Sequence, residues 1–161
     1  MTTRNKTVLI VDDESAQRAW MRGILRRQGY AVLVAADYPE ALSIKTRHTE
    51  QIDLFVIDLR LPGGSGYDLS QELLAAHPTS KILFVSGTTG AELCKYFANP
   101  LPVGQLLHKP FEAAQFASRV REIFQPSAAA MVAGESAGSN VRADGAPFRP
   151  VIGSRKRQPK C

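Results

Sequence analysis

The chain has 161 residues, of which 44% are hydrophobic and 22% are charged, and its formal net charge is +5. A chain of this length can form one sizeable hydrophobic core but is too short to form two. No apolar run approaches membrane-spanning length, and the first ten residues lack the apolar core of a signal peptide. We therefore expect a soluble globular protein in the cytoplasm, with no membrane span.

The positive charge is concentrated near the C-terminus. Residues 1–125 carry 14 Lys/Arg against 13 Asp/Glu, whereas residues 126–161 carry 6 against 2. The second stretch is rich in Pro, Ala, Gly and Ser, and without apolar periodicity it cannot bury enough surface to offset its ordering entropy. We predict a folded domain over residues 1–125 and a flexible basic tail over residues 126–161. The alternative explanations for this stretch are an expression remnant and a shortened longer chain.

Short apolar runs alternate with segments of helical spacing throughout residues 1–125. The β-branched content and short length of the runs favour strands. Because strands alternate with helices, we expect an α/β fold with a parallel sheet covered on both faces. In chain order the predicted elements are strand Val8–Val11, a helix around Met21–Gln28, strand Ala31–Ala35, helix Tyr38–Thr49, strand Leu54–Ile57, helix Tyr67–Ala76, strand Ile82–Val85, helix Ala91–Ala98, strand Leu106–Leu107 and helix Glu112–Phe124.

Polar residues stand where four of the predicted strands end. The carboxyl ends of parallel strands meet at one rim of the sheet, which is where such sheets bind ligands. Crowded carboxylates repel one another unless a cation compensates, and an oxygen-rich cluster suits a hard divalent ion such as Mg²⁺. The sequence therefore predicts a magnesium site at this rim. The strand-end residues are Asp12, Asp13, Asp58, Ser86 and Lys109.

A lysine and a hydroxyl beside a metal site indicate that a phosphoryl group binds there. The only histidine in these segments is His108, which strand alternation places on the opposite face from Lys109, so we expect it to pack. The nucleophile is then expected to be a carboxylate, with Asp58 at the end of the central strand the best placed. Taken alone, Asp12 and Asp13 are equally compatible with a helix N-terminus.

Four segments together resemble the receiver domain of two-component response regulators, over about residues 5 to 125. They are VLIVDDE, FVIDLRLPGGSGYDL, FVSG and LLHKPF. The resemblance implies a flavodoxin-like, doubly wound, five-stranded parallel sheet of order 2-1-3-4-5 with helices on both faces. It also implies that Asp58 accepts a phosphoryl group from a sensor histidine kinase or a histidine phosphotransfer protein.

The resemblance also assigns roles to the other rim residues. It implies that Asp13, Asp58 and the backbone carbonyl of Arg60 hold Mg²⁺ directly, while Asp12 acts through water. Lys109 and Ser86 would contact the phosphoryl group. The peptide bond between Lys109 and Pro110 would be cis.

These implications lead us to expect a single-domain response regulator in phosphorelay signal transduction. It would promote its own phosphorylation and dephosphorylation without being a turnover enzyme. Its output would pass through contact with a downstream protein or through onward relay, and homodimerisation stays open. The alternatives are a phosphohydrolase with an Asp nucleophile, a phosphorylation-independent binding module, and nucleic-acid contact through the basic tail, although nucleic acid is not a partner that we expect for this chain.

The sequence departs from the family pattern in two places. Leu106 stands where most receivers carry an aromatic residue, three positions before the strand-five lysine, so the usual aromatic switch is in doubt. The fourth helix is short and prolines follow it, which predicts a rearranged segment between Ser86 and Gln105. Trp20 can be an exposed anchor for a partner protein or can pack against a neighbouring helix.

Overall fold

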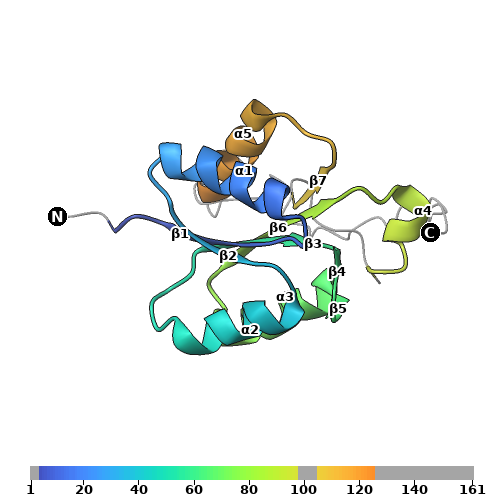
Figure 1. Ribbon diagram of the computed structural model, residues 1–161, viewed down its shortest axis with the longest axis horizontal. Helices are drawn as coiled ribbons and strands as arrows, with labels where there is room; N and C mark the ends of the chain where they lie inside the picture. The colour runs from blue at the N-terminus through green and yellow to red at the C-terminus, as the bar shows by residue number, and fades with distance from the viewer. Residues whose placement is uncertain (1–3, 98–104, 126–161) are drawn as a thin grey trace, which may run out of the picture.

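The computed structural model describes residues 4–97 and 105–125. Its centre is a five-stranded sheet in which all neighbours pair in parallel, in the order β2-β1-β3-β6-β7 (Figure 1). This confirms the predicted flavodoxin-like sheet and its strand order. The segment predicted to be a tail lies outside the described residues. The strands are β1 Thr7–Val11, β2 Ala31–Ala35, β3 Leu54–Asp58, β6 Lys81–Ser86 and β7 Leu106–His108.

Helices cover both faces of this sheet. Figure 1 shows α1 (Ser15–Arg27) and α5 (Ala113–Phe124) on one face and α2 (Tyr38–Arg47) and α3 (Gly66–Ala76) on the other. Alternate residues of β1 enter the two cores: Val8 packs with the residues of α1 and α5, and Leu9 packs with those of α2 and α3. The near-continuous apolar runs in the sequence therefore reflect strands that are buried on both sides. Among the described residues, no helix is long and apolar enough to cross a membrane.

A small antiparallel hairpin follows the central strand. Strand β4 (Arg60–Leu61) pairs with β5 (Gly64–Ser65) around a turn formed by Pro62 and Gly63. Gly63 has a φ of +87°, which a turn with proline at its second position and glycine at its third requires. This hairpin was not predicted from the sequence.

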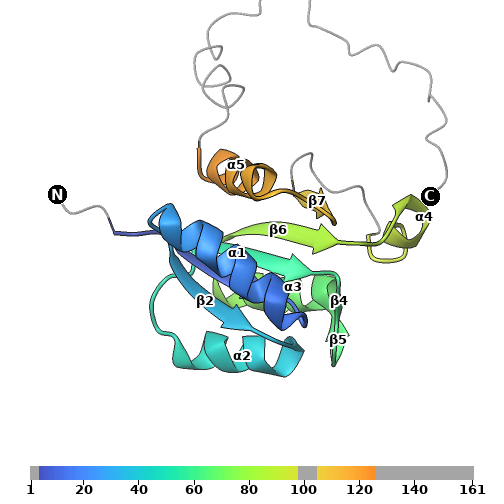
Figure 2. The same ribbon diagram turned by 45° about the horizontal axis from the view of Figure 1, so that its top comes forward.

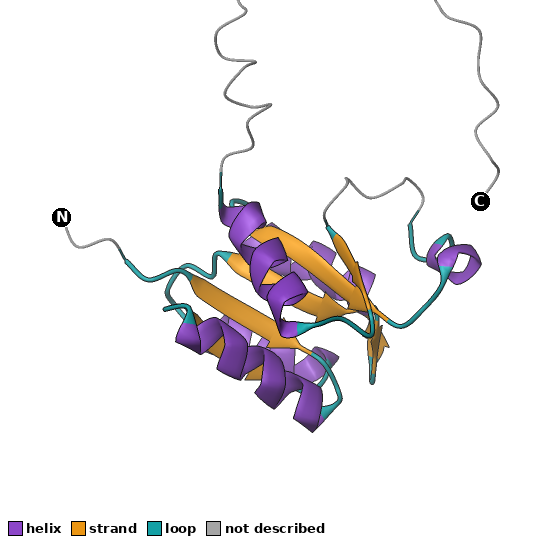
Figure 3. Ribbon diagram, turned by 90° about the horizontal axis from the view of Figure 1, so that it is seen from above, coloured by secondary structure: helices purple, strands orange, loops and turns teal. Residues whose placement is uncertain are grey.

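Helix α4 is shorter than predicted, because it spans only Gly90–Leu93 and ends before the expected Ala98. Figures 2 and 3 agree that α4 lies beyond the carboxyl end of the sheet, away from the strands. Four residues later, the Phe97 ring packs edge-on against Tyr67 and Phe84, with centroids 5.3 Å and 5.4 Å away. Phe84 is in register with Leu106, so an aromatic cluster stands beside the position where the family usually has its own aromatic residue.

One packing prediction is wrong, because His108 is exposed. Its neighbour Leu107 packs into the core beneath α1 and α5. His108 and Leu106 therefore share the opposite face of β7, which is an edge strand. On that face α4 is only a single turn and does not cover His108. Strand alternation therefore predicted the correct face for the His108 ring, but the prediction that the ring is packed was wrong.

Candidate functional site

The three predicted carboxylates meet at the rim of the sheet. Val11 of β1 is in register with Ile57 of β3, so Asp12 and Asp58 leave the two strands side by side. Ligand oxygens of Asp12, Asp13 and Asp58 all lie within 4.8 Å of one another. Asp12 is fully buried, Asp58 is 8% exposed, and Asp13 faces solvent. The cluster is therefore an all-oxygen group of ligands that is open to solvent on the side of Asp13.

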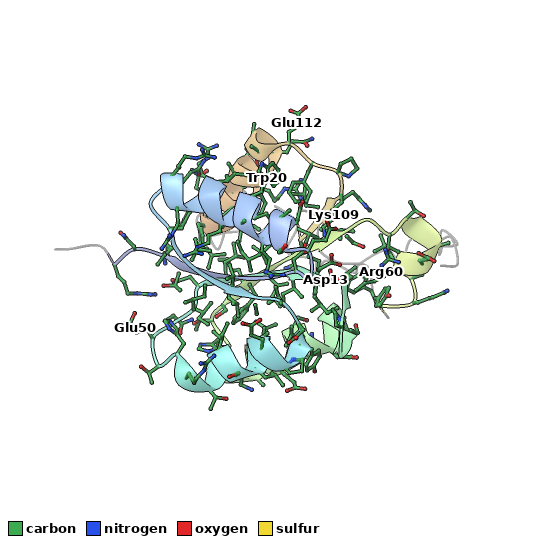
Figure 4. All side chains as sticks on the ribbon, in the orientation of Figure 1. Asp13, Trp20, Glu50, Arg60, Lys109 and Glu112 are labelled. Carbon is green, nitrogen blue, oxygen red and sulfur yellow. The ribbon has the colours of Figure 1, made fainter. Side chains whose placement is uncertain are left out.

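Lys109 supplies the positive charge inside this cluster. Its Nζ donates to Asp12 Oδ2 at 2.7 Å and to Asp58 Oδ2 at 2.6 Å. The backbone that carries it is fixed by a hydrogen bond from the Lys109 N–H to the carbonyl of Ser86 and by a cis bond to Pro110, as the resemblance implied. Figure 4 shows Lys109, Asp13 and Arg60 gathered at the same end of the sheet.

Burial and charge act in opposite directions on these groups. Burial raises the pKa of Asp12, although the hydrogen bond from Lys109 opposes this effect. Burial alone would lower the pKa of Lys109, but the hydrogen bonds to Asp12 and Asp58 outweigh it, and the net shift is upward. Lys109 therefore remains an ammonium at neutral pH. One ammonium among three carboxylates leaves an excess of negative charge that a divalent cation would neutralise.

Three backbone N–H groups hold the polar side chains in place. Glu14 donates to Asp12 Oδ1 at 2.9 Å, and Arg60 donates to Asp58 Oδ1 at 2.9 Å. In the same pattern, the Thr88 N–H donates to Ser86 Oγ at 3.0 Å. Each donor stands two residues after its acceptor, which is the local turn that Asp and Ser side chains favour. The helix-terminus alternative is wrong, because Asp12 accepts from the N–H of Glu14, the residue before α1, and the first turn of α1 contains no acidic residue.

One residue near the site, Arg18, had no role in the sequence-based prediction of the site. Arg18 of α1 donates from Nη1 to the backbone carbonyl of Asp12 at 2.6 Å, which ties the helix to the strand end. Thr88 is 4% exposed, and its Oγ1 has no hydrogen-bond partner among the described residues. Spacing alone does not reveal the Arg18 contact, because it depends on how α1 packs against the end of β1.

A pocket of about 690 Å³ opens over the carboxylates. Its wall includes Asp13, Asp58, Lys109 and Trp20. Trp20 is 38% exposed, and its ring centroid lies 5.8 Å from that of Phe111. The ring therefore packs against Phe111, in the segment between β7 and α5, and is partly exposed at the pocket, while its role as a partner anchor stays a prediction.

The residues that meet here fit a magnesium ion. All three side chains of the cluster offer carboxylate oxygens, which are the ligands Mg²⁺ prefers, and the open side leaves room for water or phosphate oxygens. Burial raises the pKa of Asp12, and a divalent cation bound beside it would favour the ionised carboxylate.

The comparisons with known proteins agree on one family. The sequence model described as "Response regulator receiver domain" matches residues 8–121. Among curated proteins, the chain is 37% identical over 122 residues to sensor kinase CckA of Brucella abortus, a match covering 74% of this chain and 12% of CckA. It is 30% identical over 120 residues to the transcriptional regulatory protein CpxR of Klebsiella pneumoniae, covering 74% of this chain and 50% of CpxR. The match thus spans only part of each relative.

Solved structures agree with this result. The receiver domain of the hybrid histidine kinase CckA is 32% identical, with a TM-score of 0.60, covering 74% of this chain and 99% of that domain. A CheY-like receiver domain protein from Methanospirillum hungatei is 25% identical, with a TM-score of 0.63 and coverages of 74% and 93%. A response regulator from Burkholderia pseudomallei, solved with a phosphorylated aspartic acid, a calcium ion and citrate, is 26% identical, with a TM-score of 0.60 and coverages of 82% and 74%.

Proposed function

The chain belongs to the response regulator receiver domain family, and on this basis we propose that it receives a phosphoryl group on Asp58 in a phosphorelay. The observation that carries the proposal is the setting of Asp58: one carboxylate oxygen accepts from the Arg60 N–H and the other from Lys109 Nζ. Two further carboxylates stand within metal-binding distance. Residues 1–125 would form this receiver, and residues 126–161 a flexible tail.

In the proposed reaction, a carboxylate oxygen of Asp58 attacks the phosphorus of a phosphohistidine on a partner protein. The new P–O bond forms as the P–N bond breaks, and the imidazole nitrogen keeps the electron pair. The product is an acyl phosphate on Asp58. Water later attacks the same phosphorus, which releases inorganic phosphate and restores the carboxylate. The family is generally not one of turnover enzymes, and we propose the same for this chain.

The surrounding residues would stabilise the charge that develops on the phosphoryl oxygens. Lys109 Nζ already lies 2.6 Å from Asp58 Oδ2, so small motions would let it follow the phosphoryl group. Ser86 is 1% exposed and accepts from the Thr88 N–H, which leaves its own hydroxyl hydrogen to donate to a phosphoryl oxygen. These groups are positioned before the reaction begins, so little reorganisation is needed.

We propose that Asp13, Asp58 and the backbone carbonyl of Arg60 hold Mg²⁺, with Asp12 contacting its water ligands. Bound Mg²⁺ would neutralise charge shared between the carboxylate and the incoming phosphoryl group. Receiver domains bind Mg²⁺ at an acidic pocket of this kind. The hydrogen bond from the Arg60 N–H to Asp58 supports this proposal, because it keeps the backbone of Arg60 close to the cluster.

The phosphoryl donor is proposed to be a sensor histidine kinase or a histidine phosphotransfer protein in the cytoplasm. Trp20, on the wall of the pocket, offers an aromatic anchor for it. Helix α1 contains four arginines and no acidic residue, and among the described residues none of the four makes a salt bridge. A donor with an acidic contact surface would fit this helix. Output would pass to a downstream protein or to a further relay partner.

The test is intact-mass detection of phosphorylation by phosphoramidate, a small donor with a P–N bond. We expect one phosphoryl adduct that requires Mg²⁺ and is absent in Asp58→Asn. Circular dichroism should show that the variant is folded, because asparagine keeps the size of the side chain. An adduct that persists in Asp58→Asn would place the acceptor elsewhere. No adduct from folded, Mg²⁺-binding wild-type protein would favour a phosphorylation-independent binding module.

A further inference from the structure

We propose that Tyr38 is a positioning residue for the metal site, because it clamps the β4–β5 hairpin that carries Arg60. The inference rests on the proposed function, since it concerns how the backbone of Arg60 is held for Mg²⁺. Tyr38 is the first residue of α2 and does not line the pocket over the carboxylates.

The ring of Tyr38 lies directly against the turn end of the hairpin. A Cβ atom added to Gly64 would stand 2.8 Å from Tyr38 Cδ2, closer than real Cβ contacts come, and 3.0 Å from Cε2. The Tyr38 N–H also donates to the carbonyl of Pro62 at 3.3 Å. Pro39 packs beside the ring, with its Cδ 3.2 Å from where a Cβ on Gly63 would stand. The start of α2 thus contacts three consecutive residues of the hairpin, namely Pro62, Gly63 and Gly64.

The other end of the side chain is fixed as well. The Tyr38 hydroxyl donates to Glu72 Oε1 of α3 at 2.6 Å. This hydrogen bond raises the pKa of Tyr38 to about 12, so the phenol remains a donor at any physiological pH. One side chain therefore joins α2 to α3 while its ring contacts the hairpin.

The hairpin needs such support because it is very small. It has two residue pairs, Arg60 with Ser65 and Leu61 with Gly64. Two-stranded ribbons are marginally stable on their own, so contacts from outside must set the position of this one. A shift at Gly64 would pass through the adjacent pair to Arg60, whose N–H holds Asp58 Oδ1.

The helix does not need this tyrosine in order to begin. The Asp37 side chain already caps α2 by accepting from the Glu40 N–H, and Pro39 occupies the first turn, where proline is favoured. The Tyr38 ring makes its contacts outside the helix, with the hairpin and α3. Its position therefore serves the hairpin and not the helix start.

The experiment compares Tyr38→Ala with Tyr30→Ala. Tyr30 is a matched control because its ring also packs against another aromatic ring, that of Phe124, with centroids 5.4 Å apart, but in the core on the opposite face of the sheet. Magnesium affinity is measured by calorimetric titration with MgCl₂, and stability by urea unfolding without metal. The fluorescence of Trp20, the single tryptophan, gives a second reading at the pocket.

We expect Tyr38→Ala to weaken Mg²⁺ binding about tenfold, the lower end of the effect seen when residues behind metal ligands are changed. Tyr38→Phe keeps the ring and should lie between wild type and Tyr38→Ala. Tyr30→Ala should lose stability and keep wild-type affinity. If Tyr38→Ala does not fold, Tyr38→Leu restores apolar volume and is expected to show the same loss of affinity.

Equal loss of stability in the two alanine variants with unchanged Mg²⁺ affinity would overturn the clamp. If that result came with normal phosphorylation of wild-type Asp58, the proposed function would stand and only the clamp would fail. If the wild-type protein bound no Mg²⁺ and took no phosphoryl group, the proposed function itself would fail, and the clamp with it.

Discussion

Replacing Gly66 with alanine tests how closely α3 is fitted to the phosphoacceptor strand. Gly66 is the first residue of α3, and its N–H donates to the Leu59 carbonyl at 3.0 Å. A Cβ at this position would stand 2.0 Å from the backbone carbonyl oxygen of Asp58 and 3.0 Å from Ile57 Cγ2. Neither neighbour can rotate away, because one is backbone and the other belongs to a fully buried residue.

The size of the effect follows from that overlap. Carbon–oxygen contacts in proteins settle at about 3.3 Å or more, so α3 and the end of β3 would have to separate by more than ~1 Å. Overpacking of this kind costs about 1–3 kcal/mol of stability. A displacement of ~1 Å at a reacting group can cost about 10²-fold in rate. We therefore expect Gly66→Ala to be folded but less stable, and to take up phosphoryl groups from phosphoramidate far more slowly.

Gly23→Ala is the matched control, because a Cβ there meets no atom within 4 Å. It lies inside α1, where alanine is favoured over glycine by about 1 kcal/mol, so this variant should gain stability and keep the wild-type rate. Stability is read from urea unfolding and the rate from intact-mass time courses. A Gly66→Ala protein with wild-type stability and rate would refute the claim that the helix start and the Asp58 carbonyl are in obligatory contact.

Two further predictions concern metal and pH. Mg²⁺ should raise the free energy of unfolding by about 2.7 kcal/mol at a concentration of 100 Kd. Asp13→Asn should lose most of this gain, and without metal it should be more stable than the wild type because one repelling carboxylate is removed. Urea midpoints with and without MgCl₂ measure both effects, and equal gains in the two proteins would contradict the metal site. Burial lowers the pKa of His77 below 6.5, and the charges of His48 and Lys45 add to this, so the unfolded chain binds the proton more readily and stability should fall as pH drops below 6.5. His77→Gln should flatten that dependence in urea midpoints measured across this range; an unchanged slope would rule out His77 as its source.

The sheet and the acidic rim could be predicted because both depend on local sequence patterns, namely short apolar runs and the polar residues that follow them. Four of the five apolar runs have four or five residues, which is enough to define a strand, and the polar residues that follow four of the runs mark the rim. Parallel pairing then brings Asp12 and Asp58 together without further information, since residues at equivalent ends of neighbouring strands must be adjacent. The same reasoning placed Lys109 at this rim, and its contacts with both carboxylates agree with that placement.

The features that were missed depend on contacts between distant segments. Arg18 reaches the Asp12 carbonyl only because α1 packs back over β1, and Tyr38 meets Gly64 only because α2 begins beside the hairpin. The exposure of His108 follows from the short α4, whose end the apolar spacing of residues 91–98 did not mark. In each case the residue type was visible in the sequence, but its neighbours were not.

The two hydrogen bonds of Lys109, to Asp12 and Asp58, affect when the charges of the rim can be balanced as the chain is synthesised. Lys109 is separated by 97 residues from Asp12 and by 51 from Asp58, so the contacts that balance the cluster are among the most non-local in the domain. A nascent chain that has left the ribosome only as far as β6 holds all three carboxylates without their ammonium partner. The segment after the last strand therefore supplies the ammonium group that balances the carboxylates after β1 and β3. A fragment ending before β7 would keep the repulsion among the three carboxylates and would lack the Lys109 ammonium that offsets it.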